Sequence, residues 1–463
     1  MSTALHKCTE RVAREVLSQG DVHVVTHIDA DGIAAGAIAR RCLDRAGIEN
    51  SIQFVKQLDA ETIQSLKDSG RFVWFTDLGS GMISRMAGLE CVVTDHHLPE
   101  PGRQGSKNNG WHLNPHLFGL DGGQEISGAG LAYTVATAMD GRNRDLVGLA
   151  VVGASGDLQD AATCRFEGWN RRLISAGTEL GKVSVHLDIR LFGRQTKPVY
   201  KLLQYADDPL LPELSGRERA CIAFLSDLGV EVRRGEDWRR WIDLTAGEKS
   251  AILSRLCQLL ITKGFGHRCA ARLVGEVYEL ASEERGTPLR DAREFATLLN
   301  STARYGHADV GLHICLGDRD EYLRRAQSLL QSHRKSIVHG IRFVKSEGIQ
   351  EFGALQYFNA GAHIRDTVVG IIAGIMLHSR QANPGVPIIG FAEKENGDVK
   401  ASARTTSPLV SRGVNLSTAI QKVARRVGGM GGGHDIAAGA TIPRGTERDF
   451  LVLLDKEIRD QLT

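Results

Sequence analysis

The chain contains 463 residues, of which 42% are hydrophobic and 24% are charged, and its formal net charge is +2. This composition is that of a globular protein and argues against a disordered chain, and at roughly 100–200 residues per domain the length predicts two or three domains. The small net charge excludes a strong overall basic field. A local basic groove that binds nucleic acid is still compatible with it.

The cysteines and the apolar segments indicate a cytoplasmic protein. The eight cysteines are scattered without a CxxC pair, which predicts free thiols rather than a disulfide framework or a thiolate zinc site. The first residues carry charges throughout and lack the apolar segment of a signal peptide. The longest apolar stretch, at 368–377, is about half as long as a membrane span requires, so no membrane partner is expected.

The N-terminal part of the chain alternates strand-length apolar runs with helical periods. Strands that alternate with helices are typical of a parallel, doubly wound α/β sheet. The runs are almost continuously apolar, which fits a sheet that is covered on both faces. We therefore assign residues 1–185 to an α/β domain. Its expected elements are strands at 22–28, 51–57, 71–79 and 91–97 and a helix at 32–47.

The rest of the chain divides into a helical part and a second α/β part. Residues 186–340 show helical patterns without a sheet rhythm, which predicts a helical linker or an inserted subdomain. Residues 341–463 alternate again and predict a smaller α/β domain. Its expected elements are a strand at 351–359, a helix at 363–380, a hairpin over 386–404 with its turn at 395–398, and a helix at 416–430.

Acidic residues and histidines form four clusters in the N-terminal domain, and we place each cluster at the carboxyl end of a strand. In an open α/β sheet this edge is where ligands bind. Four strands would therefore bring five aspartates and up to three histidines, including His27, to one crevice. The cluster residues that follow the apolar runs are Asp29, Asp31, Asp77, Asp95, His96, His97 and Asp157.

A group of ligands with this composition predicts bound metal ions. Carboxylates gathered in one place raise each other's pKa unless cations lie between them. Mixed carboxylate and imidazole ligands suit Mn²⁺, Fe²⁺ or Zn²⁺ better than Ca²⁺. Two ions about 3.5–4 Å apart that share a carboxylate would use so many ligands, and such a pair favours phosphodiester hydrolysis. For a single aspartate such as Asp31 or Asp77 the alternative is a helix N-cap, but this does not account for four clusters together.

The order of these motifs resembles that of the DHH phosphoesterase superfamily. The N-terminal motifs are HIDADG at 27–32, the lone Asp77 after a strand, DHH at 95–97 and GASGD ending at Asp157. Three further segments are similar to RecJ-type chains, the last of them to the archaeal RecJ-like group that includes the GINS-associated nucleases: NPH at 114–116, SGAG at 127–130 and residues 289–318. Near the C-terminus, SAR at 402–404, GGGH at 431–434 and AAGA at 437–440 resemble the accessory domain called DHHA1.

The resemblance implies a role for each motif residue. Two divalent cations are implied, with Mn²⁺ expected and Mg²⁺ as the alternative. One cation would be held by His27, Asp29 and Asp77, and the other by Asp31, Asp77, His96 and Asp157, so that Asp77 bridges them. Asp95 would orient His96 as its hydrogen-bond acceptor. His97 would contact the scissile phosphate or assist its protonation, which makes Asp77, Asp95 and His97 the expected catalytic residues.

The C-terminal motifs predict a substrate-binding region. The glycines are too permissive for ordinary core, and a loop of this kind can bring backbone N–H groups against a phosphate. Arg404 could add a bidentate donor. The alternative is a flexible turn. We expect this domain to close over an active-site cleft between the two α/β domains and to hold the terminal nucleotides of the substrate. The expected substrate-binding residues are Ser402, Arg404, Gly431, Gly432, Gly433 and His434.

Together these features predict an exonuclease that hydrolyses terminal phosphodiester bonds of single-stranded nucleic acid, DNA more than RNA, in replication or repair. By resemblance, GINS or other replisome and helicase proteins are expected partners. The first alternative is a small-substrate DHH phosphodiesterase that acts on oligonucleotides, cyclic dinucleotides or pyrophosphate. The second is a replisome scaffold without catalysis. Bacterial RecJ usually carries a carboxylate where His27 stands and continues into an OB fold, so polarity does not follow from the resemblance. Candidates for base stacking, with the core as their alternative, are Tyr305, His307, Tyr357 and Phe358.

Overall fold

A computed structural model of the chain describes residues 3–100, 111–378 and 381–462. These residues form two compact units, Met1–Leu330 and Gln331–Thr463, and each unit has its own sheet and its own core. None of the helices in the described ranges has the length and apolarity needed to cross a lipid bilayer.

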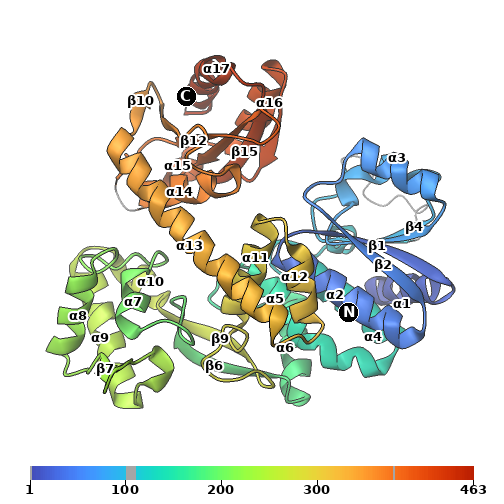
Figure 1. The fold of residues 1–463 in the computed structure, drawn as a ribbon, viewed down its shortest axis with the longest axis horizontal. Helices are drawn as coiled ribbons and strands as arrows, with labels where there is room; N and C mark the ends of the chain where they lie inside the picture. The colour runs from blue at the N-terminus through green and yellow to red at the C-terminus, as the bar shows by residue number, and fades with distance from the viewer. Residues whose placement is uncertain (1–2, 101–110, 379–380, 463) are drawn as a thin grey trace. The chain divides into compact units, whose positions relative to one another are not determined.

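The N-terminal unit is built on a five-stranded parallel sheet with the order β2-β1-β3-β4-β5 (Figure 1). Its strands are β1 (Asp21–His27), β2 (Glu49–Val55), β3 (Phe72–Thr76), β4 (Cys91–Thr94) and β5 (His112–Leu113). Val24 and Trp74 face a core formed with helices α1 (Thr3–Leu17), α2 (Ala30–Ala46) and α4 (Gly128–Met139). Val25 and Phe75 face a second core formed with α3 (Ala60–Ser69) and η1 (Ser80–Met86). Because both faces are covered, the central strand β3 is buried throughout, whereas the edge strand β2 is mostly half-buried. The predicted doubly wound sheet is confirmed.

The run before Asp157 is a helix, α5 (Val147–Gly156), and not the strand that we predicted. α5 contacts α2, α4 and α11 (Ala292–Arg304), and most of its residues are buried. A helix that is buried on all sides has no polar face, so its apolar run has no periodicity to distinguish it from a buried strand. Three strand ends and one helix end therefore carry the acidic clusters.

The predicted helical middle, residues 186–340, is confirmed, and it also contains two pairs of strands that were not predicted. β6 (Val183–Ile189) pairs antiparallel with β9 (Val274–Leu280), and β7 (Arg233–Arg234) pairs with β8 (Asp237–Trp238). β6 and β9 lie far apart in the sequence, so no local alternation of strands shows that they pair. The segment between them has its own core around Leu202, Trp241 and Leu256. Its helices are α7 (Val199–Gln204), α8 (Glu218–Asp227), η4 (Trp241–Asp243), α9 (Ala246–Thr262) and α10 (Gly266–Ala271).

The chain returns to the first core after β9. Phe295 in α11 and Ile314 in α12 (Ala308–Cys315) are buried among the residues of the parallel-sheet core. These helices therefore belong with the parallel sheet rather than with the inserted segment. The other short elements of this unit are η2 (Pro115–Phe118), η3 (Gly141–Leu146) and α6 (Gly168–Glu179), and α13 (Glu321–Glu347) follows them.

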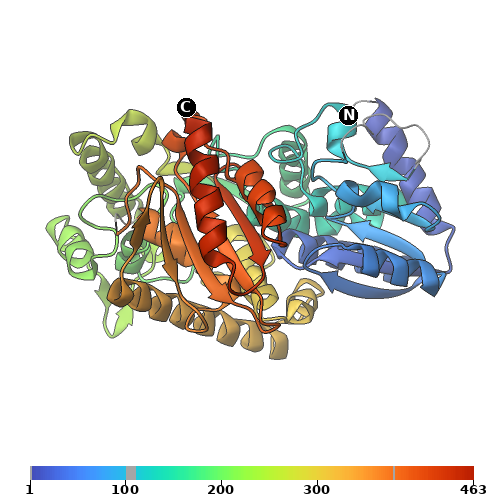
Figure 2. The same ribbon diagram turned by 90° about the horizontal axis from the view of Figure 1, so that it is seen from above.

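The C-terminal unit has a six-stranded mixed sheet with the order β10-β11-β12-β13-β15-β14. Its strands are β10 (Gln350–Phe352), β11 (Leu355–Asn359), β12 (Ile388–Glu393), β13 (Val399–Arg404), β14 (Met430–Gly433) and β15 (Ala437–Ile442). Its helices are α14 (Asp366–His378), α15 (Ser407–Ser411), α16 (Leu416–Arg426) and α17 (Glu447–Leu462). Figure 2 shows α17 lying along the sheet, where Phe450 and Leu454 pack with Phe391. α14 packs on the opposite face with Phe358 and Ile388.

The predicted hairpin over 386–404 is confirmed, since β12 and β13 pair antiparallel around the turn at 394–398. The predicted strand at 351–359 is instead two strands, because the chain reverses at Gly353, whose φ of 62° favours glycine. The predicted helix at 363–380 begins at Asp366, and its last two residues lie outside the described ranges.

Candidate metal centre and substrate site

His27 and Asp29 meet where β1 leads into α2. His27 is the last residue of β1, and Asp29 is the N-cap of α2. One carboxylate oxygen of Asp29 accepts a hydrogen bond from the Gly32 N–H at 3.0 Å, and the other lies 2.9 Å from His27 Nδ1. Asp29 therefore caps the helix with one oxygen and faces His27 with the other. We had treated a helix cap and a metal ligand as alternatives for a single aspartate.

Asp31 lies inside the first turn of α2 and is fully buried. The Gly128 N–H donates to its Oδ2 at 2.6 Å, and the Ala129 N–H donates to its Oδ1 at 3.0 Å. Both donors belong to the first turn of α4, whose partial positive charge stabilises an anion. The N-cap alternative for Asp31 was wrong, and the aspartate is instead held by the N-terminus of a different helix.

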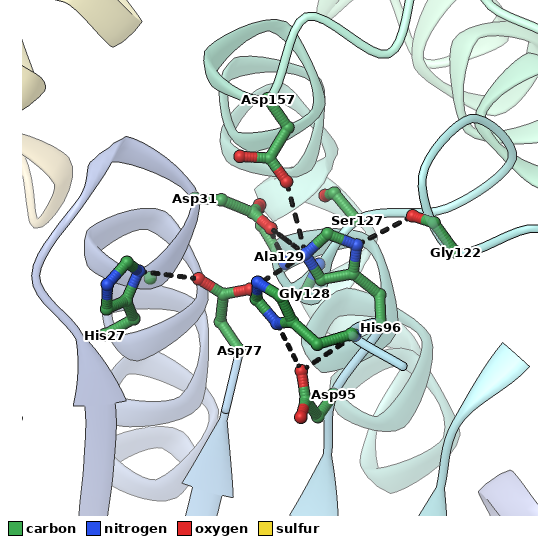
Figure 3. Close-up of polar contacts among 12 residues, drawn as sticks. His27, Asp31, Asp77, Asp95, His96, Gly122, Ser127, Gly128, Ala129 and Asp157 are labelled. Atoms are coloured by element: carbon green, nitrogen blue, oxygen red, sulfur yellow. Dashed lines mark hydrogen bonds and ion pairs between the residues drawn. The ribbon is translucent and has the colours of Figure 1, made fainter. Parts of the chain in front are cut away.

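Asp77 is the central residue of the cluster (Figure 3). It directly follows β3, and its φ of 60° places it in the left-handed region, which an aspartate adopts at a cost in free energy. Its Oδ1 lies 3.1 Å from His96 Nε2, and its Oδ2 lies 3.7 Å from His27 Nδ1. The residue is 1% exposed and caps no helix, because η1 has Gly79 as its N-cap.

His96 completes a second group with Asp31 and Asp157. Its Nε2 lies 3.2 Å from Asp157 Oδ2 and 3.7 Å from Asp31 Oδ2 (Figure 3). Its other ring nitrogen, Nδ1, lies 2.7 Å from the Gly122 carbonyl oxygen and donates to it, which directs Nε2 at the carboxylates. Asp157 is the C-cap of α5 and reaches the group from the helix end.

The structure thus gathers every residue that the resemblance assigned to metal binding. Potential ligand atoms of His27, Asp29 and Asp77 lie within 4.8 Å of one another. The same holds for Asp31, His96 and Asp157, and for Asp77 with His96 and His97. Asp77 belongs to two of these groups, as a bridging carboxylate would.

The cluster atoms are close together but are not hydrogen-bonded in the way that buried polar atoms ordinarily are. His27 Nδ1, both carboxylate oxygens of Asp77 and His96 Nε2 are buried without a hydrogen-bond partner, although each has an oppositely charged atom within 3.7 Å. The candidate ligand atoms within each group lie within 4.8 Å of one another, close enough to share one cation. Divalent cations held by these groups would satisfy all of the atoms, so the residues fit the implied metal ions.

The pKa values in the cluster show the charge that such cations would balance. Burial and the Asp77 carboxylate raise the pKa of Asp31 to about 7, and burial together with Asp31 raises the pKa of Asp157 well above its usual value. Burial alone would lower the pKa of His27, but Asp29 and Asp77 raise it to about 11. Protons therefore neutralise part of this crowded negative charge, and the same charge would attract divalent cations.

Asp95 orients His97 and not His96, so the predicted pairing of Asp95 with His96 was wrong. Asp95 Oδ1 lies 2.8 Å from His97 Nδ1 and accepts the His97 N–H, while Oδ2 accepts the Ser80 N–H at 2.8 Å. The side chains of His96 and His97 point in different directions, and Asp95 contacts the His97 ring. Burial alone would lower the pKa of His97, but the Asp95 carboxylate raises it.

Asn114 fixes the backbone of this loop, and neither its contacts nor its burial were predicted. It is fully buried, and its amide donates at 2.8 Å both to Ser80 Oγ and to the His97 carbonyl oxygen. His116 Nε2 in turn lies 3.1 Å from the His96 carbonyl oxygen. The segment 114–116 therefore holds the carbonyl groups of both histidines while leaving their rings directed at the cluster and at solvent.

Replacing Asn114 with alanine is expected to destabilise the protein and to lower any activity of the cluster. Loss of the amide leaves two buried acceptors unsatisfied, which costs about 1–3 kcal/mol, and a loosened loop weakens metal affinity about 10–100-fold. Chemical denaturation and Mn²⁺ titration measure the two effects. Asn50→Ala, which removes an amide that bonds Asp44 on the far side of α2, is the control. Unchanged metal affinity in Asn114→Ala would contradict the assigned role.

The C-terminal motifs are joined through β15. Ser402 on β13 pairs with Gly439 on β15, and Gly432 on β14 pairs with the same residue from the other side. Arg404 pairs with Ala437, whose carbonyl oxygen accepts the His434 N–H at 2.8 Å. The two motifs, widely separated in the sequence, thus lie on the two strands that flank β15 in one sheet.

The glycines at 431–433 form an edge strand and not the loop that we predicted. A Cβ atom at Gly431 would meet Ile420 Cγ2 at 2.8 Å, and one at Gly433 would meet the Ala437 carbonyl oxygen at 2.6 Å. At Gly432 the same atom would meet nothing within 4 Å. Close packing therefore requires two of the glycines, and the middle one leaves backbone uncovered for a ligand. His434 is exposed just beyond the strand.

Comparison with protein families and with curated proteins identifies the chain. Residues 191–274 match the DHH-CID domain, and residues 354–460 match the DHHA1 domain. Over 467 aligned residues the chain is 30% identical to the uncharacterized protein MJ0831 of Methanocaldococcus jannaschii, covering 99% of this chain and 98% of that protein. The chain belongs to the DHH/DHHA1, RecJ-like superfamily.

Solved structures show the same fold as this RecJ-like chain. CDC45 from Entamoeba histolytica matches with a TM-score of 0.69 and 12% identity, with 99% of each chain covered. RecJ from Thermus thermophilus in complex with Mn²⁺ matches with a TM-score of 0.59 and 18% identity over 99% of this chain, which spans 55% of that RecJ chain. An exonuclease RecJ bound to manganese matches with a TM-score of 0.58 and 17% identity, covering 98% and 94% of the two chains.

Two further residues of this RecJ-like chain, which were not predicted from the sequence, lie at the start of α2 beside the cluster of aspartates and histidines. Asn300 Oδ1 accepts the Ala30 N–H at 2.9 Å, so the end of α11 is joined to the start of α2. Burial lowers the pKa of Arg304 on the same helix, and the nearby Asp29 carboxylate opposes this. Both residues lie in the segment 289–318 whose resemblance we noted, but only the fold brings that segment to the HIDADG motif.

The four aromatic candidates differ in their exposure. Phe358 is 3% exposed in the core of the C-terminal unit, and Tyr357 bonds Gln350 on the neighbouring strand. Tyr305 and His307 are half-buried near the end of α11. For Phe358 the core alternative was therefore correct.

Gly370 makes room for the Arg404 side chain. A Cβ atom at this position of α14 would meet Arg404 Nη2 at 2.7 Å and the Ser402 side chain at 3.2 Å. Gly370→Ala is therefore expected to displace two proposed substrate-binding groups and to raise KM about tenfold with a smaller change in kcat. Gly374→Ala on the same helix is the control, because its nearest contact is Arg404 Cγ at 4.0 Å. Equal KM values in the two variants would contradict the role of Arg404.

Proposed function

We propose that this RecJ-like chain is a metal-dependent exonuclease that hydrolyses terminal phosphodiester bonds of single-stranded nucleic acid. The observation that carries the proposal is Asp77, whose two buried carboxylate oxygens lack hydrogen-bond partners and lie between His27 and His96. A carboxylate shared by two groups of ligands suits a pair of divalent cations, which is the arrangement used in many phosphodiester hydrolases. All of the assigned positions are occupied by residues that can act as ligands.

The proposed ligand sets follow the two groups of side chains. His27, Asp29 and Asp77 would hold one cation, and Asp31, Asp77, His96 and Asp157 would hold the other. When bound, such cations lower the pKa of a water molecule and neutralise charge on the phosphate. We expect Mn²⁺ at both positions, with Mg²⁺ as the alternative, because the ligands combine carboxylates with imidazoles.

His97 would act on the substrate rather than on the cations. Its Nδ1 donates to Asp95, which leaves Nε2 for a phosphate oxygen or for the leaving oxygen. The side chain of His97 is 54% exposed, whereas that of His96 is almost fully buried. One histidine of the pair would thus ligate metal, and the other would donate a hydrogen bond to the reacting phosphate.

We assign the terminal nucleotides of the substrate to the DHHA1 domain. Ser402, Arg404 and His434 offer donors on or just beyond the two strands that flank β15, and a Cβ atom at Gly432 would meet open space. A polymer with one phosphate at the metal centre and another at these donors would be gripped at both points, which favours strands over small substrates.

The test is the degradation of single-stranded DNA and RNA, labelled at the 5′ or the 3′ end, in the presence of Mn²⁺. We expect release of mononucleotides from one end of long strands, with DNA preferred, and much slower cleavage of duplexes. Turnover confined to dinucleotides, cyclic dinucleotides or pyrophosphate would establish the small-substrate alternative. Absence of any cleavage, together with tight binding to replication proteins, would establish the scaffold alternative.

The cellular role in DNA replication or repair, a cytoplasmic location and a partner such as GINS or another replisome protein are part of this proposal. They are supported by the resemblance to the archaeal RecJ-like group and by the CDC45-like fold. Co-purification of the chain with replication proteins would test the partner. Loss of co-purification when residues 191–274 are removed would show that this segment is the contact. Failure to co-purify would remove the partner from the proposal while leaving the nuclease activity to its own test.

A further inference from the structure

Leu158 combines an exposed apolar side chain with a backbone conformation that disfavours leucine. Its φ is 55°, and the residue is 55% exposed. It follows the C-cap Asp157 at the end of α5, where the Gln159 N–H donates to the Ala154 carbonyl oxygen at 3.2 Å and closes the helix. The left-handed position after a helix is usually glycine, because a Cβ atom there is unfavourable.

The fold itself does not require a leucine at this position. The Leu158 side chain belongs to none of the apolar cores formed by the described residues. Its only described hydrogen bonds are made by the backbone, to Ser155 and from Ala161. Glycine or asparagine would adopt the same conformation at lower cost and would expose less apolar surface. A feature that costs stability and serves no packing is typical of a residue that contacts a ligand.

The position of Leu158 shows where that ligand lies. Adjacent Cα atoms are about 3.8 Å apart, so the side chain begins directly beside Asp157, whose carboxylate lies 3.2 Å from His96. Leu98, which follows His97, is 75% exposed. Of the twelve large apolar side chains exposed among the described residues, these two directly follow residues of the proposed metal centre. Two exposed leucines therefore stand next to cluster residues in the chain, one after Asp157 and one after His97.

We propose that Leu158 packs against the nucleobase next to the scissile phosphate. This inference rests on the proposed function and adds a specificity determinant to it: the site would require a base, and not only a phosphate, beside the bond that is cut. Every base has an apolar face, so an aliphatic side chain holds the end of a strand without reading its sequence. Of the aromatic candidates, Phe358 cannot provide this contact, because it is buried in the C-terminal core.

The experiment compares two strands that differ only in whether the terminal residue at the hydrolysed end carries its base or is abasic. We expect the kcat/KM of wild type to be about tenfold higher on the strand with the base. This ratio corresponds to one apolar contact that contributes about 1.4 kcal/mol. In Leu158→Asn, which keeps the left-handed backbone but loses the apolar contact, this ratio falls to about one. The readout is the ratio between the two strands within each protein, so a change in rate that both strands share does not affect it.

Two further variants separate a contact with the base from an effect on folding. Leu158→Gly loses the same ratio while its Tm equals or exceeds that of wild type, because glycine relieves the strained φ. Leu187→Asn, at a leucine that is 78% exposed on β6, keeps the tenfold ratio. An unchanged ratio in Leu158→Asn, or no effect of the base in wild type, would overturn the inference alone. Absence of cleavage of either strand by wild type would overturn the proposed function and this inference with it.

Discussion

Replacing Asp77 with asparagine is expected to abolish hydrolysis while leaving the fold intact. Asparagine has nearly the same shape and tolerates the left-handed φ of 60°, so the backbone is preserved. The variant loses the negative charge that both ligand groups share, and we expect at least a ~10³-fold loss of kcat together with a large loss of Mn²⁺ affinity. Hydrolysis of end-labelled strands and calorimetric Mn²⁺ titration measure the two effects.

The metal-free form of Asp77→Asn is expected to be at least as stable as metal-free wild type. Asp77 helps to raise the pKa of Asp31 to about 7, and removing its charge relieves the repulsion between these buried carboxylates. Asp59→Asn is the matched control, because Asp59 is the N-cap of α3 in the same domain and asparagine caps a helix equally well. Normal activity in Asp77→Asn, or an equal loss in Asp59→Asn, would show that the cluster is not the active site.

The second large effect is expected for Gly128→Ala. A Cβ atom at Gly128 would lie 2.5 Å from both Cβ and Oδ1 of Asp77, closer than any two such atoms approach. The start of α4 must therefore move away from the cluster, which costs about 1–3 kcal/mol and displaces the N–H group that donates to Asp31 at 2.6 Å. We expect an activity loss of about 100-fold or more.

Gly141→Ala provides the comparison for this prediction, because a Cβ atom at Gly141 meets nothing within 4 Å. Urea denaturation and Mn²⁺ titration of the two variants separate a general loss of stability from a specific loss of metal affinity. If Gly128→Ala bound Mn²⁺ as tightly as Gly141→Ala, the close packing of α4 against Asp77 would not matter for the site.

The metal-binding edge could be predicted from the sequence because its signal is local. Each of three apolar runs ends in an acidic residue, and in a parallel sheet these ends lie at one edge. β1, β3 and β4 do end in this way, with Asp29, Asp77 and Asp95 following them. Asp157 was placed correctly in space but for the wrong reason, since a buried helix and a buried strand both appear as an apolar run.

Contacts between distant segments could not be predicted in the same way. The choice of His97 rather than His96 as the partner of Asp95 depends on the direction of two adjacent rings, which the sequence does not encode locally. The support that Asn114 gives to the histidine loop requires knowing that 114–116 returns to β4. The pairing of β6 with β9 likewise joins strands with a whole folded segment between them.

The glycine-rich motif shows how one pattern can favour two structures. Consecutive glycines are typical of a mobile loop, because their backbone is unusually free. Here they form β14, since β15 and α16 lie so close that side chains at Gly431 and Gly433 would collide with them. The glycines therefore allow neighbouring elements to pack closely against β14, and they do not indicate a mobile loop. Of the three, only Gly432 has open space where a side chain would lie.

The most direct test of the two-metal site is the number and coupling of Mn²⁺ ions bound per chain, measured by metal analysis and electron paramagnetic resonance on the same sample. A carboxylate shared between His27 and His96 predicts two ions per chain with a magnetically coupled spectrum, and one uncoupled ion in Asp77→Asn. A single uncoupled ion in wild type, or binding that is unaffected by the loss of Asp77, would contradict the account.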